Sequence, residues 1–114
     1  MAFFPSCKIG GGTEEVNLGI SGVSCYKSGD VIQLVINKQV SESTGNKWLT
    51  LGILPQELRP KTQLNGCGYD NSVSSYEAAK VIAYRILASD GSISFYVFND
   101  HKAFDFRAVV TYLI

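Results

Sequence analysis

Apolar and polar residues alternate with a period of two along most of the chain that follows Thr13. The segment VIQLVINKQV, residues 31–40, is the clearest case, because Ile32, Leu34 and Ile36 fall on one face of it. This period is typical of a β-strand that packs one face on a core. Since no segment carries a convincing helical stripe, the pattern predicts an all-β fold.

Turn signals divide the chain into about seven short strands, spaced roughly ten residues apart. Gly29-Asp30 closes one predicted hairpin, and Asp90-Gly91 favours a second tight turn. Short strands at this spacing are typical of a small antiparallel β-barrel or β-sandwich. We expect strands at 16–20, 23–30, 31–40, 48–54, 78–88, 92–98 and 104–114, whereas QLNGCGY, residues 63–69, is short and rich in glycine.

The chain divides into a short leader and one domain. Residues 1–13 contain the glycine run IGGG, which makes a flexible linker, and residues 14–114 have the length of a single domain. An initiating Met followed closely by such a linker leads to the hypothesis that the chain is a piece of a longer protein.

The only tryptophan lies in the segment WLTLGIL, residues 48–54, directly before a loop that contains two of the three prolines. Simple alternation assigns the residues of this segment to two faces, with Leu49, Leu51 and Ile53 on one and Trp48, Thr50 and Leu54 on the other.

Two predicted strands, 31–40 and 109–113, carry apolar residues on both faces over part of their length. Such strands are buried on both sides, which a thin single domain does not easily provide. A partner subunit would cover the second face. The alternative is a central strand that other parts of the same chain cover.

Charge and cysteine usage exclude several classes of partner. Ten acidic and ten basic residues give no net charge, and neither sign forms the basic stripe of a nucleic-acid or membrane-surface binder. No apolar run approaches the ~20 residues that span a bilayer. Cys7, Cys25 and Cys67 form no CxxC pair, so we expect three free, mostly buried thiols. No metal or cofactor is implied, because the single His101 lies far along the chain from every cysteine.

Known enzyme motifs do not occur: there is no GxSxG, no HExxH, no phosphate loop and no pair of carboxylates with an obvious role. We therefore expect a protein that binds rather than an enzyme.

The segment NDHKAFDFR, residues 99–107, concentrates polar chemistry in Asp100, His101, Asp105 and Arg107. Asp105 and Arg107 are two apart on a predicted strand, so both lie on one face. One interpretation is a solvated salt bridge beside a polar turn. The other is a saccharide site, because carboxylates and a guanidinium fork hydrogen-bond neighbouring hydroxyl groups.

Three further residues extend this candidate site. Tyr96 lies on the preceding hairpin, and Arg85 lies on the strand before that. Trp48 is either a platform on which a sugar ring stacks or a half-buried packing residue.

The stretch GNKWLTLGILPQELRPKT, residues 45–62, resembles a signature of bacteriophage tail-fibre and baseplate receptor-binding domains. In that signature, a strand of the form W-x-x-L-G-x-L-P leads into a proline-locked loop that contains R-P. The chain is most similar to the head domain of lactococcal siphophage receptor-binding proteins, over residues 18–114. The residues that match are Trp48, Leu51, Gly52, Leu54, Pro55, Arg59 and Pro60.

This resemblance implies a homotrimeric β-barrel head at residues 14–114, which binds host cell-wall saccharide near the clefts between protomers. It also implies that residues 1–13 derive from a neck. The partners would be host polysaccharide and other baseplate proteins, and the protein would be found in the virion after assembly in the host cytoplasm. Of the family's ligand residues, Arg107 and an aromatic at Phe95 or Tyr96 fit best.

Two alternatives from other classes stay open. One is a structural baseplate or decoration protein that binds only other virion proteins. The other is a small glycan-cleaving or esterase domain, against which the lack of a carboxylate pair argues.

Overall fold

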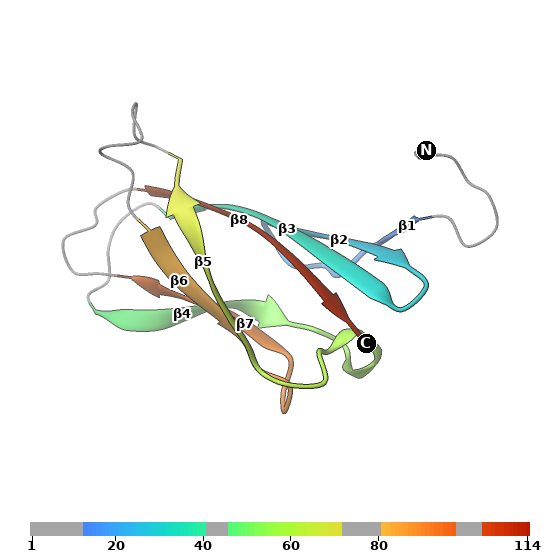
Figure 1. Cartoon of the computed structure of the whole chain (residues 1–114). Helices are drawn as coiled ribbons and strands as arrows, with labels where there is room; N and C mark the ends of the chain where they lie inside the picture. The colour runs from blue at the N-terminus through green and yellow to red at the C-terminus, as the bar shows by residue number, and fades with distance from the viewer. Residues whose placement is uncertain (1–12, 41–45, 72–80, 98–103) are drawn as a thin grey trace.

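Eight β-strands form one curled antiparallel sheet in the computed structural model, which describes residues 13–40, 46–71, 81–97 and 104–114 (Figure 1). The order across the sheet is β1-β2-β3-β8-β5-β6-β7-β4. The predicted all-β, barrel-like fold of about seven strands is thereby confirmed. The strands are β1 Glu14–Val16, β2 Val23–Ser28, β3 Val31–Val40, β4 Lys47–Ile53, β5 Leu64–Asp70, β6 Val81–Ile86, β7 Ser92–Val97 and β8 Phe104–Leu113.

The centre of the sheet is the pair of ten-residue strands β3 and β8. They pair over their whole length, from Val31 opposite Leu113 to Val40 opposite Phe104. Because side chains alternate between the two faces of a strand, every second residue of each strand points to the inner face of the curled sheet. The alternation predicted for both strands is confirmed.

One strand prediction was wrong, and one segment that was left unassigned is a strand. The first strand ends at Val16 rather than continuing to Ile20, because Asn17 turns the chain: its Oδ1 accepts a hydrogen bond from the N–H of Gly19 at 3.0 Å, and Gly19 has φ +69°. The glycine-rich segment that includes Gly66 is a full strand, β5, paired with β6. A side chain at Gly66 would collide with the Tyr84 ring, so glycine permits the close packing here.

A β-bulge in β4 changes the predicted faces of its last residues. The register with β7 shifts between Thr50 and Gly52, which leaves Leu51 as the extra residue. Ile53 therefore pairs with Ser92, on the outer face, and is 60% exposed. The prediction that Ile53 shares a face with Leu49 was wrong for this reason, since simple alternation takes no account of an inserted residue.

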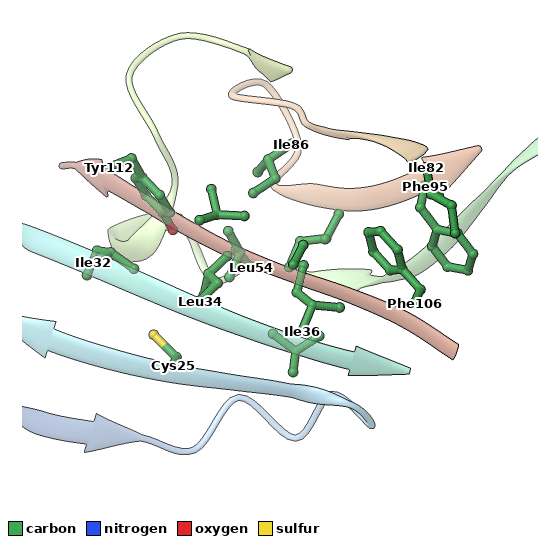
Figure 2. Close-up of a cluster of buried hydrophobic side chains, with 14 of the residues drawn as sticks. Cys25, Ile32, Leu34, Ile36, Leu54, Ile82, Ile86, Phe95, Phe106 and Tyr112 are labelled. Atoms are coloured by element: carbon green, nitrogen blue, oxygen red, sulfur yellow. The ribbon is translucent and has the colours of Figure 1, made fainter. Parts of the chain in front are cut away.

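The hydrophobic core lies on the inner face of the sheet (Figure 2). Phe95 stacks on Phe106, with ring centroids 4.8 Å apart and planes 16° apart, and meets Phe104 edge-on at 6.1 Å. Aliphatic residues from β3, β6 and β7 fill the rest of the interior. Those that are fully buried are Ile32, Leu34, Ile36, Ile82, Ile86, Ile93 and Val97.

The loop after β4 closes one end of the curled sheet. It contains a short 3-10 helix, Gln56–Leu58, and buries Leu54 and Leu58 against the core. The Tyr112 hydroxyl donates a hydrogen bond to the carbonyl of Leu58 from inside. Arg59 also stabilises the loop, because its Nε donates a hydrogen bond to the Leu54 carbonyl at 3.0 Å. The proline-bracketed loop is thus part of the core.

Candidate saccharide-binding site

The structure describes five of the seven predicted site residues; Asp100 and His101 lie outside the described residues. All five occupy the outer face: Arg85, Tyr96, Asp105 and Arg107 alternate with residues that point into the core, and Trp48 lies directly opposite Tyr96. The structure does not bring the five into one cluster. It separates them into an aromatic cluster, which is Trp48, Arg85 and Tyr96, and a charged pair, which is Asp105 and Arg107.

The aromatic cluster comes from three neighbouring strands at one edge of the sheet. Trp48 on β4 is directly opposite Tyr96 on β7, and their rings meet edge to face, with centroids 5.4 Å apart and planes 74° apart. Arg85 reaches across β7 from β6 and places its guanidinium carbon 4.1 Å from the centroid of the Trp48 ring. This distance is that of a cation–π contact, which holds both side chains in place.

The hydroxyl groups of Thr50 and Ser94 lie beside the aromatic cluster on the outer face. Ser94 pairs with Arg85 on one side and with Thr50 on the other. The Thr50 and Ser94 hydroxyl oxygens lie 3.2 Å apart and share a hydrogen bond. Although Ser94 is on the outer face, it is only 4% exposed, so side chains of this cluster cover it.

The Arg85 guanidinium retains hydrogen-bonding capacity. Its Nε is shielded from solvent and has no hydrogen-bond partner. A shielded donor without a partner costs free energy, typically about 1–3 kcal/mol, which a ligand oxygen that accepts a hydrogen bond from Nε would offset. The cation–π contact with Trp48 restrains the guanidinium, so that its position is largely set before a ligand arrives.

The charged pair lies on β8. The Arg107 Nη2 donates to the Asp105 Oδ2 at 3.3 Å, and Asp70 on β5 accepts a hydrogen bond from the Asp105 main-chain N–H at 3.1 Å. Arg107 faces Tyr69, which in turn faces Val81 at the opposite end of β6 from Arg85. Four residues of strand correspond to about 13 Å, which is too far for one small sugar to contact both groups.

Three residues that take part in these two groups, namely Thr50, Ser94 and Asp70, were not predicted from the sequence. Alternation with Tyr96 was a usable signal for Ser94, since it places both on one face. The role of Asp70 had no signal in the sequence, because it depends on the long-range pairing of β5 with β8.

Only one of the two cysteines that the structure describes is buried. Cys25 lies in the core, where burial raises the pKa of its thiol. Cys67 is exposed on β5, so the expectation of mostly buried thiols was wrong for this residue, whereas Cys7 lies outside the described residues. Within the described part of the chain, no three His, Cys, Asp or Glu side chains gather as metal ligands, and no helix is long and apolar enough to cross a membrane.

No known protein family matches the chain, and no curated protein is similar enough in sequence to serve as a relative. The chemistry of the outer face therefore carries the functional interpretation. An aromatic pair, a guanidinium and the exposed hydroxyl of Thr50 form a surface that can stack on the C–H side of a sugar ring and hydrogen-bond its hydroxyls.

Proposed function

We propose that this chain is a non-catalytic saccharide-binding module, and that it serves as the receptor-binding head of a bacteriophage tail tip. The observation that carries the proposal is the aromatic cluster of Trp48, Arg85 and Tyr96. An aromatic ring beside an oriented donor is what recognition of a sugar requires, because a sugar has an apolar C–H surface and a polar edge.

Binding at one such site is weak. Trp48, Arg85 and Tyr96 are half-buried side chains on the outer face, so we expect a small sugar to keep much of its surface in water and to bind with dissociation constants in the millimolar range. In the proposed homotrimer, with many heads on one particle, effective concentration turns weak sites into firm attachment. Host cell-wall polysaccharide and other baseplate proteins are the proposed partners, and the virion is the proposed location.

The single tryptophan makes the test direct. Because Trp48 is the only tryptophan in the chain, its fluorescence reports on the aromatic cluster alone. N-acetylglucosamine, galactose, glucose and glycerol are titrated in turn to molar concentration, with a salt of equal osmolarity as the control. A saturable change in the emission of Trp48 with at least one of these compounds supports the proposal.

A matched pair of variants localises the binding. Arg85→Gln removes the guanidinium from the aromatic cluster and leaves Trp48 as the reporter, whereas Arg107→Gln makes the same change at the charged pair. We expect Arg85→Gln to weaken binding about tenfold, the effect of about 1.4 kcal/mol, and Arg107→Gln to leave it unchanged. Equal binding by both variants would show that the aromatic cluster is not the site.

A structural protein that binds only other virion proteins is a second candidate function. The observation that favours it is the exposure of Val109 and Leu113 on the central strand β8, at 61% and 63%. This candidate would be favoured if no saccharide in the panel bound and the protein was nevertheless incorporated into particles.

A further inference from the structure

Exposed apolar side chains gather on the outer face of the sheet, around its centre. Of the six large apolar side chains that are exposed among the described residues, five lie on four adjacent strands, β3, β8, β5 and β6, and the sixth is Ile53 on β4 (Figure 1). The five are Val31, Tyr69, Val81, Val109 and Leu113. Half-buried Val35 lies opposite Val109, and Val31 lies opposite Leu113, so the apolar pairs follow β3 and β8 along their length.

The same face is almost uncharged. Alternation brings Gln33, Asn37 and Gln39 of β3 to it, together with Thr111 of β8. The charged residues that reach it on β3, β8 and β5 are Asp105 and Arg107, and these two neutralise each other. Depletion of charge at the centre of a surface is the compositional signal of a protein–protein interface.

We infer that the outer face of β3 and β8 binds a second copy of this chain. The ten-residue strands β3 and β8 are about 33 Å long, whereas β2 has six residues and β5 has seven, so at about 4.8 Å per strand the flat footprint of the four is roughly 500 Å². Side chains enlarge the accessible area beyond this footprint, which brings it near the ~800 Å² that each partner contributes to a standard interface.

A second copy suits this surface better than a partner of a different fold. Another copy presents the same apolar, nearly uncharged surface, so its side chains can cover the exposed apolar side chains of this face without leaving a charge unpaired. The face presents no net charge with which to select an acidic or basic partner, and the chain as a whole has none with which to repel another copy. Because it assigns an interface within the proposed trimer, this inference rests on the function proposed above.

The test is the light-scattering mass of the purified chain and of the double variant Val109→Lys with Leu113→Lys. We expect the unaltered chain to have the mass of several copies, three in the proposed trimer. The variant should have the mass of one copy at the same concentration, because it would bury two ammonium groups without partners. Ile53→Lys is the control, since it changes an equally exposed apolar residue outside this face, and it should keep the mass of the unaltered chain.

Further measurements make the outcome decisive. Near-ultraviolet circular dichroism establishes that the lysine variant is folded, and Val109→Thr with Leu113→Thr repeats the test with residues that favour strands. A single-copy mass for the unaltered chain, or an unchanged mass for folded lysine and threonine variants, overturns the inference. Saccharide binding by a chain of single-copy mass would reject this interface while the saccharide site stands. A multi-copy mass that only the β8 variants abolish, with no saccharide binding, would support the interface and reject the proposed function.

Discussion

The stretch from Lys47 to Pro60 has two halves, of which the first contributes side chains to the outer surface and the second contributes side chains to the core. In the first half, β4, Trp48 and Thr50 face outward and belong to the aromatic cluster. In the second half, Leu54 and Leu58 face inward and close one end of the core. The bulge between Thr50 and Gly52 separates the halves, because its extra residue brings the following side chains into a new register.

This difference changes what the resemblance to phage receptor-binding heads can tell. Of the residues that carry it, Leu54 is buried, Gly52 leaves room for Ile20, and Arg59 fastens the loop to the backbone. Trp48, by contrast, contacts the guanidinium of Arg85 on the outer face. Leu54, Gly52 and Arg59 therefore have structural roles in this chain, whereas Trp48 lies in the proposed binding surface.

The largest expected effect comes from the inward half. Leu54→Ala should lower the free energy of unfolding by about 2–5 kcal/mol, because it leaves a cavity beside Leu58 and Tyr112. Ile53→Ala is the matched control one residue away. Because this side chain is exposed, the substitution should lower the free energy of unfolding by no more than about 0.5 kcal/mol. Urea unfolding measures both. Equal losses for the two variants would contradict the positions of these residues on opposite faces.

The buried Tyr112, whose hydroxyl donates a hydrogen bond to the Leu58 carbonyl, should make the stability of the protein sensitive to alkaline pH. Burial raises the pKa of the Tyr112 phenol above its ordinary value of about 10. The folded state therefore keeps its proton while the unfolded chain loses it, so stability is unaffected below pH 10 and falls by about 1.4 kcal/mol per pH unit above it. Tyr112→Phe removes a hydrogen bond but should show a shallower alkaline decline. Unfolding free energies of both proteins between pH 8 and 11.5 test this, and parallel curves would refute it.

Arg59 should contribute less than the buried leucines do. Its Nε donates to the Leu54 carbonyl at 3.0 Å and its Nη1 to the Ser89 carbonyl at 3.4 Å, so it joins the loop to the turn between β6 and β7. Arg59→Met keeps most of the stem and removes both hydrogen bonds, at a cost of about 1–2 kcal/mol. Thermal unfolding measures the loss, and saccharide titration should give the same affinity as the unaltered chain. A loss of affinity would show that the loop takes part in binding.

Trp48→Ala should have the smallest effect on stability and the largest on binding. It removes an edge-to-face contact and a cation–π contact on an outer surface, together worth about 1 kcal/mol. Saccharide binding should fall below detection, because no platform is left. Ligand-observed nuclear magnetic resonance is the suitable measurement, since this variant has no tryptophan to report. Binding that survives the substitution would assign the site elsewhere.

The sequence predicted the fold better than the site. Alternation in 31–40 and 104–114 is strong because both strands have one face in the core, and Asp90-Gly91 forms the expected turn, with φ +76° at Gly91. The faces after Thr50 were mispredicted and the strand at 64–70 was not assigned, since the effects of a bulge and of several glycines depend on what lies opposite them. The grouping of the site residues depends on strand order, and nothing local along the chain states that β5 lies between β8 and β6.

The measurement that tests the central claim most directly is a ¹H–¹⁵N spectrum recorded during titration with the best-bound saccharide of the panel. The two halves of the stretch from Lys47 to Pro60 are then compared in one experiment. We predict saturable shifts at Thr50, Arg85 and Ser94, and at the indole N–H of Trp48, with the signals of Leu54 and Leu58 unmoved. Shifts centred on the loop or on Asp105 and Arg107, with those of the aromatic cluster unmoved, would contradict it.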